Sequence, residues 1–155
     1  MLSAIEEFFE SSDMDEIAER ILELEDPGLH HIFVKHAVQK AMDRCDRERE
    51  TVSNLISFLY PHVLSGVLDS QQFFFLIFFV DFLGDQLGQG FTKLLLSAED
   101  LVLDNPEAVH FLTNFLGRII VDEVVPPSFL TSALGSLKDH SLGVQIVEET
   151  GERVP

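Results

Sequence analysis

The chain has 155 residues, of which 46% are hydrophobic, and a formal net charge of −17. This length and hydrophobic content fit one globular domain with its own core and exclude a wholly disordered chain. A surface this acidic repels phosphate backbones, so we expect no direct nucleic-acid binding, and it attracts basic protein surfaces. Acidity also keeps proteins soluble, and composition alone favours that simpler interpretation.

Cysteine content and hydropathy indicate the cellular compartment in which the protein is found. The single cysteine, Cys45, excludes an internal disulfide and fits a reducing compartment, so we expect a location in the cytoplasm and also in the nucleus. The first residues carry acids and no basic segment, which argues against a secretory or mitochondrial leader. The apolar run 73–83 contains Asp81 and is shorter than the roughly 20 residues that a bilayer span needs, so we expect no membrane contact.

The first half of the chain predicts four helices from the spacing of its apolar residues. They cover 2–10, about 12–24 and about 29–44, and the fourth runs from the charged turn 43–50 toward Pro61 or Gly66. The second helix starts with a cap and an acid at the required spacing, supplied by one of two pairs, Ser12 with Asp15 or Asp13 with Glu16. The third helix carries a stripe that we expect to be buried: Phe33, Val34, Ala37, Val38 and Ala41.

The second half begins with a segment that the pattern does not assign. The run 73–83 has neither a helical nor an alternating period, and Gly84, Gly88 and Gly90 predict a flexible connector after it. A helix is then predicted from Phe91 to Asn105, which precedes a proline. Its apolar face comprises Phe91, Leu94, Leu95, Ala98, Leu101 and Val102.

An acidic elbow at 97–109 joins this helix to the next one. Asp100 and Asp104 lie four residues apart and therefore share the polar face of the first helix. Pro106 suits the first position of the second helix, with Asn105 as its cap, and that helix continues to Ile120. Helices at 128–137 and 142–149 follow, and then a frayed tail at 149–155.

Helices joined by short turns, with no alternating segment, predict an all-α fold of stacked antiparallel hairpins, an α-solenoid. We expect a single domain at 1–148. No pair of histidines has the four-residue spacing of a helical metal site, and no nucleophile motif occurs. Asp100 and Asp104 are the one candidate acid pair, but nothing near them in sequence supplies further ligands or a nucleophile. We therefore predict no catalytic residue, no metal and no cofactor, and spacing alone favours two solvated acids.

Several motifs together resemble the MA-three domain, a helical module of translation regulators of the programmed-cell-death-four type and of large initiation-factor scaffolds. The resemblance extends from about residue 3 to 137. The motifs are LEDP at 24–27 with HHIFVK at 30–35, AMDR at 41–44 with RERE at 47–50, GFTKLL at 90–95, DLVLDNP at 100–106 and VDEVVPPSFL at 121–130.

The resemblance implies a HEAT/armadillo-like solenoid and a non-enzymatic adaptor that binds the DEAD-box RNA helicase of translation initiation. The contact residues of the family correspond to Asp100, Asp104 and Pro106 in the elbow, and a further contact acid corresponds to Asp43. Two alternatives stay open. The chain is a scaffold of the same fold with another partner, or it is a member whose helicase surface is spoiled by an insertion.

That insertion is the main departure from the family, because an extra Phe-rich segment at about 73–86 separates two motifs. It is either a genuine apolar extension or a translated pyrimidine-rich intron end. The last helix is also shorter than the family implies, so we expect a truncated copy or a part of a longer multi-domain protein.

Overall fold

The computed structural model describes residues 2–23, 29–62 and 85–154, and every regular element in these ranges is a helix. Residues 85–96 are helical, and the labelled helices are α1 (Leu2–Ser11), α2 (Met14–Leu22), α3 (His30–Met42), α4 (Asp46–His62), α6 (Ala98–Asp104), α7 (Ala108–Val121), α8 (Ser128–Leu134) and α9 (Leu142–Arg153). The all-α prediction is confirmed. Within the described ranges, no helix has the length and apolar character needed to cross a membrane. The unassigned run 73–83 lies outside these ranges.

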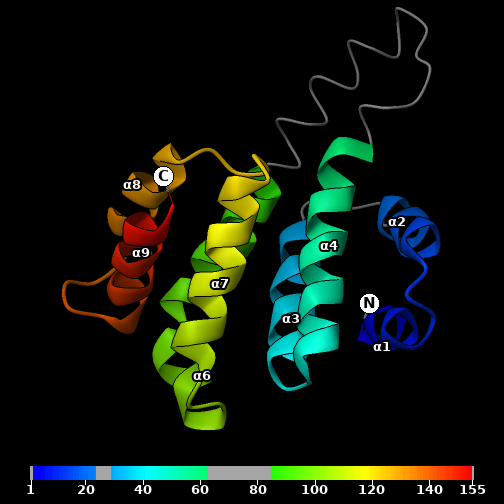
Figure 1. Cartoon of the computed structure of the whole chain (residues 1–155), viewed down its shortest axis with the longest axis horizontal. Helices are drawn as coiled ribbons and strands as arrows, with labels where there is room; N and C mark the ends of the chain where they lie inside the picture. The colour runs from blue at the N-terminus through cyan, green and yellow to red at the C-terminus, as the bar shows by residue number, and fades with distance from the viewer. Residues whose placement is uncertain (1, 24–28, 63–84, 155) are drawn as a thin grey trace, which may run out of the picture.

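Consecutive helices pair into hairpins that stand side by side (Figure 1). α1 packs on α2, α3 on α4, α6 on α7 and α8 on α9. The second helices of the hairpins also contact one another in chain order, α2 with α4, α4 with α7 and α7 with α9. They form one continuous layer, which is the HEAT-like solenoid that the sequence predicted.

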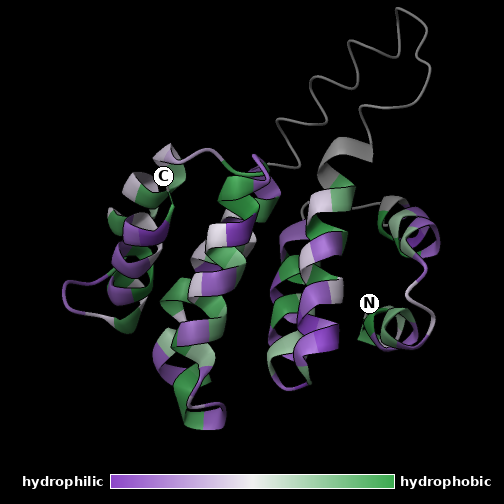
Figure 2. Cartoon of the chain, viewed as in Figure 1, coloured by the Kyte–Doolittle hydropathy of each residue, from purple (hydrophilic) through white to green (hydrophobic). Residues whose placement is uncertain are grey.

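The core runs through the whole stack. The predicted stripe of α3 is buried at every position, which confirms it. Leu55 on α4, Leu94, Leu116 on α7 and Ile146 on α9 are at most 1% exposed and belong to the same apolar cluster. Figure 2 shows hydrophobic and hydrophilic residues alternating along each helix, as expected for helices that bury one side and expose the other.

The structure selects one of the two predicted starts of α2. The side chain of Asp13 accepts a hydrogen bond from the backbone N–H of Glu16 at 3.0 Å. Ser12, the alternative cap, has a φ of 55° and belongs to the turn between α1 and α2. The pair Asp13 and Glu16 is therefore the one that starts this helix.

The flexible connector predicted around Gly88 and Gly90 is wrong for the described residues, because 85–96 is helical. Gly90 is buried, and a Cβ atom there would lie 3.0 Å from the carbonyl oxygen of His31 and from Cβ of Val34. The missing side chain lets this helix approach α3 closely. Glycine serves here for packing, at the cost of lower helix propensity.

The tail predicted to fray at 149–155 is also corrected, since α9 continues to Arg153. Thr150 is 0% exposed, and its hydroxyl donates to the carbonyl of Ile146 at 2.7 Å. Arg153 donates to Asn114 on α7 at 3.2 Å. Packing against α7, which is not visible in the local pattern, keeps the end of the helix ordered.

A polar cluster joins α4 to α7 near the C-terminal end of α7. The carboxylate of Asp122 accepts hydrogen bonds from the hydroxyl of Ser57 and from Nε of Arg118, the latter at 2.8 Å. Burial acts to raise the pKa of Asp122, but the bonds from Ser57 and Arg118 outweigh it, and the pKa lies below its ordinary value.

The start of α9 predicts a matched pair of glycine variants. A Cβ at Gly143 would lie 2.6 Å from the carbonyl oxygen of Leu95 and 2.8 Å from Cδ2 of Leu137. We expect Gly143→Ala to lower the free energy of unfolding by about 1–3 kcal/mol, because α9 must move away. Gly151 on the same helix has room, with its nearest contact at 3.8 Å from Leu130. Gly151→Ala should leave stability unchanged or raise it in urea denaturation, and equal losses would contradict the close packing at Gly143.

The lowered pKa of Asp122 predicts a pH-dependent stability difference. The carboxyl group binds a proton less readily in the folded chain, so it stabilises the fold above the unfolded pKa, and this contribution disappears as pH falls through the folded pKa. We expect Asp122→Asn to be less stable than wild type at pH 7 and the gap to close below about pH 4. Urea denaturation across this range measures it, with Glu148→Gln as an exposed control. A gap that is constant with pH would contradict the role of the carboxylate.

Candidate functional site

The elbow is held by its asparagine. The amide Nδ2 of Asn105 donates to the carbonyl of Met42 at 2.8 Å, and its Oδ1 accepts from the backbone N–H of Glu107 at 3.0 Å. Met42 is the last residue of α3, so this one side chain joins the α6–α7 turn to the α3–α4 turn. The predicted cap role of Asn105 is present in part, because Pro106 and Glu107 form a turn and α7 begins at Ala108.

This link brings the predicted contact residues to one end of the stack (Figure 1). Asp43 directly follows Met42, and Asp104 and Pro106 flank Asn105. Asp100 lies one turn before Asp104 on α6. All four residues are exposed. We call Asp43, Asp100, Asp104 and Pro106 the docking edge.

The acids of the docking edge have no cationic neighbour within ion-pair distance in the part of the chain that the structure describes. The nearby Arg44 is engaged elsewhere, since it pairs with Glu6 and lies 4.8 Å from the ring centre of Phe9. The carboxylates therefore stay available for basic groups of another molecule.

The apolar and acidic sides of the helix before the elbow are arranged as predicted. Leu94, Leu95 and Ala98 are buried, and Leu101 and Val102 are half-buried against the core. The predicted continuous helix is interrupted at Ser97, whose hydroxyl donates to the carbonyls of Lys93 and Leu94 at 2.9 and 3.2 Å. Such bonds back to the preceding turn bend a helix.

Glu99 shows that an exposed acid in the elbow can have a structural role. Its Oε1 accepts the backbone N–H of Leu142, the first residue of α9, at 3.0 Å. Ser141 accepts from the N–H of Val144 at 3.3 Å, so two donors at the start of α9 are satisfied. Sequence reasoning assigned no role to Glu99, because its partner lies 43 residues away.

Leu103 is the second residue that sequence reasoning missed. Its side chain is 83% exposed, although it belongs to α6. A signal was present, since Leu103 falls outside the spacing of the apolar face that contains Leu101 and Val102. The docking edge therefore includes one exposed apolar side chain, three residues after Asp100 and next to Asp104 in the chain.

The α3–α4 turn is held by local bonds. Sγ of Cys45 donates to Oε2 of Glu48 at 2.7 Å, and this bond holds the pKa of Glu48 below its ordinary value. Arg49 bonds to the carbonyl of Arg44 and to Asp46, and its guanidinium lies 4.0 Å from the ring centre of Phe111 on α7. The backbone next to Asp43 is thereby fixed to α7 as well as to the elbow.

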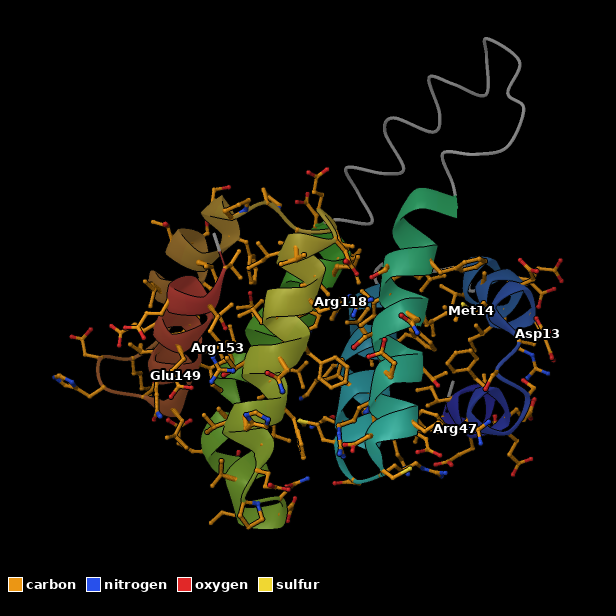
Figure 3. All side chains as sticks on the ribbon, viewed as in Figure 1. Asp13, Met14, Arg47, Arg118, Glu149 and Arg153 are labelled. Carbon is orange, nitrogen blue, oxygen red and sulfur yellow. The ribbon has the colours of Figure 1, made fainter. Side chains whose placement is uncertain are left out.

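A groove of about 520 Å³ lies over α7, between α4 and the end of α9. Arg118 reaches Glu50 and Asn54 on α4 at 3.7 and 3.5 Å, and Arg153 comes from α9, as Figure 3 shows. None of the docking-edge acids lines this groove. The acids lie on an open edge, which suits contact with a protein surface better than enclosure of a small substrate. Among the described residues, no three histidines, cysteines or acids gather as a metal site would require.

Comparison with known proteins confirms the resemblance to the MA-three domain. The model of the MA3 domain family matches residues 1–76 and 76–126. The chain is 38% identical to MA3 domain-containing translation regulatory factor 3 of Arabidopsis thaliana over 94% of its own length and 18% of that protein. Factor 4 of the same plant is also 38% identical, over 95% of this chain and 20% of that protein.

A more distant relative is eukaryotic translation initiation factor 4G of the same plant, which is 27% identical over 99% of this chain and 8% of its own length. The chain thus spans about a fifth of the translation regulatory factors and less than a tenth of the initiation factor.

The two hydrogen bonds of the Asn105 side chain predict an effect on stability. We expect Asn105→Ala to lower the free energy of unfolding by about 1–3 kcal/mol, because the Met42 carbonyl and the Glu107 amide lose their partner. Asn114→Ala removes exposed bonds to His110 and Arg153 and should stay within about 0.5 kcal/mol of wild type. Chemical denaturation compares the two, and equal effects would show that Asn105 does not hold the turns together.

Proposed function

The chain belongs to the MA3 domain family, and on this premise we propose that it is a protein-binding adaptor of translation initiation, docking on the DEAD-box RNA helicase through the docking edge. The observation that carries the proposal is the bond from Asn105 to Met42. It supports the proposal because it ties the turn that carries Asp43 to the turn that carries Asp104 and Pro106.

The chemistry of the edge supports this partner class. Three exposed carboxylates without ion pairs to described residues suit arginine and lysine side chains, which bind them by charge-assisted hydrogen bonds. The net charge of −17 adds long-range attraction to a basic surface and raises the association rate. The turns that carry the acids are fixed before binding, which reduces the entropy lost on docking.

The names of the relatives support a role in translation, since they are translation regulatory factors and an initiation factor. We propose that the chain supplies the docking module and no enzymatic step, and that it needs no cofactor, in the cytoplasm. We also propose one domain at 1–148 with an insertion near 73–86. The two matched stretches meet at residue 76, inside that segment.

Charge reversal tests the proposal. We expect Asp100→Lys with Asp104→Lys to weaken binding to the helicase by about 100-fold or more, because two charge-assisted hydrogen bonds become repulsions. Helical content and unfolding midpoint should stay as in wild type, since both side chains are exposed. Calorimetric titration with the purified helicase measures the binding, and an RNA-unwinding assay reads out the consequence.

The matched control reverses Glu148 and Glu152, two exposed acids with the same four-residue spacing on α9. This double lysine variant changes the net charge equally but leaves the docking edge intact, so it should bind within a few-fold of wild type. Retained binding by the Asp100 and Asp104 variant would overturn the site assignment. Equal losses of helicase affinity in both variants would show that net charge, and not the docking edge, determines binding.

A further inference from the structure

Leu103 is the most exposed large hydrophobic side chain in the described part of the chain. It is 83% exposed, compared with 60% for Val121 and 53% for Leu96. One exposed leucine on a protein surface is ordinary and needs no explanation. The position of Leu103 is what separates it from the others.

Leu103 lies inside the docking edge. Asp100 lies three residues before it and is therefore its neighbour on the surface of α6, and Asp104, the next residue, ends that helix. Pro106, also exposed, follows in the turn. Neither acid is in an ion pair with a described cation, so the side chain of Leu103 and the carboxylate of Asp100 next to it are both open to solvent.

Basic side chains fit both parts of this surface. Arginine and lysine carry three or four methylene groups behind the charged end. When the end bonds to Asp100, the methylene stem can lie on Leu103. A second copy of this chain is a poor occupant, because its own charge of −17 would repel the edge.

We infer that Leu103 is the apolar anchor of the docking edge, covered by the methylene stem of a basic side chain of the partner. The inference rests on the proposed function. Exposed charge pairs mainly speed association and set specificity, whereas a side chain that loses its water on binding slows dissociation. The acids attract the basic partner, and Leu103 lengthens the lifetime of the complex.

Leu103→Ala tests the anchor. We expect the Kd for the helicase to rise about tenfold, because most of the side chain that would be buried is removed. The rise should come from faster dissociation, measured by surface plasmon resonance. Leu103→Met keeps the apolar volume and should bind within about twofold of wild type. Leu96→Ala is the matched control, an exposed leucine at the end of the preceding helix, and should also bind like wild type.

The salt dependence of binding distinguishes the contribution of Leu103 from that of the carboxylates. The loss caused by Leu103→Ala should be the same at low and high salt, whereas the loss caused by Asp100→Asn should shrink as salt screens it. If the wild-type chain binds the helicase and Leu103→Ala binds it with the same Kd, Leu103 is not an anchor, but the docking edge is not contradicted. Equal losses for Leu103→Ala and Leu96→Ala also overturn it. A wild-type chain that does not bind the helicase overturns the proposed function and the anchor together.

Discussion

The hydrogen bond from Asn105 to the carbonyl of Met42 is the contact on which the site depends, because it joins two turns that are 63 residues apart in the chain. Carbonyls at the end of a helix have no partner within that helix and need one from elsewhere. The Nδ2 of Asn105 supplies a partner to the last carbonyl of α3, and its Oδ1 accepts the N–H of Glu107 in the turn before α7. One amide thus satisfies backbone groups of two hairpins and ties the turn after α3, which begins at Asp43, to the turn after Asp104.

A second constraint is the packing of the helix at 85–96 and of α6 against the neighbouring hairpins. The contact of Gly90 with the backbone of His31 fixes how closely the helix at 85–96 lies against α3. Glu99 then ties the following helix to the start of α9. α6 is therefore held from both neighbouring hairpins, and its outer side, with Asp100 and Leu103, has a fixed orientation. A segment fixed in this way presents side chains to a partner without having to become ordered first.

The sequence was sufficient for features that depend on local spacing. The apolar stripe of α3 and the common face of Asp100 and Asp104 follow from helical periodicity. Capping spacing narrowed the start of α2 to two pairs, and the structure was needed to choose Asp13 with Glu16. Features set by tertiary contact were missed. Gly90 has the same local signature in a connector as in a close helix crossing, and the ordered end of α9 depends on the burial of Thr150 where α9 packs on α7. The proximity of Asp43 to the elbow was available only through resemblance to a family.

The acidic residues of this chain form two groups according to their bonding partners. These partners distinguish structural acids from docking acids better than exposure does. Glu6 pairs with Lys40 and Arg44, Asp122 with Arg118, and Glu99 with the start of α9, so these carboxylates serve the fold. Glu148 and Glu152 are exposed too, but both lie on a single helix, α9. Among the residues that the structure describes, only the docking edge combines carboxylates free of ion pairs, two joined turns and an exposed leucine. Acids that contribute little to stability are the ones that selection for binding can place freely, because their loss does not unfold the domain.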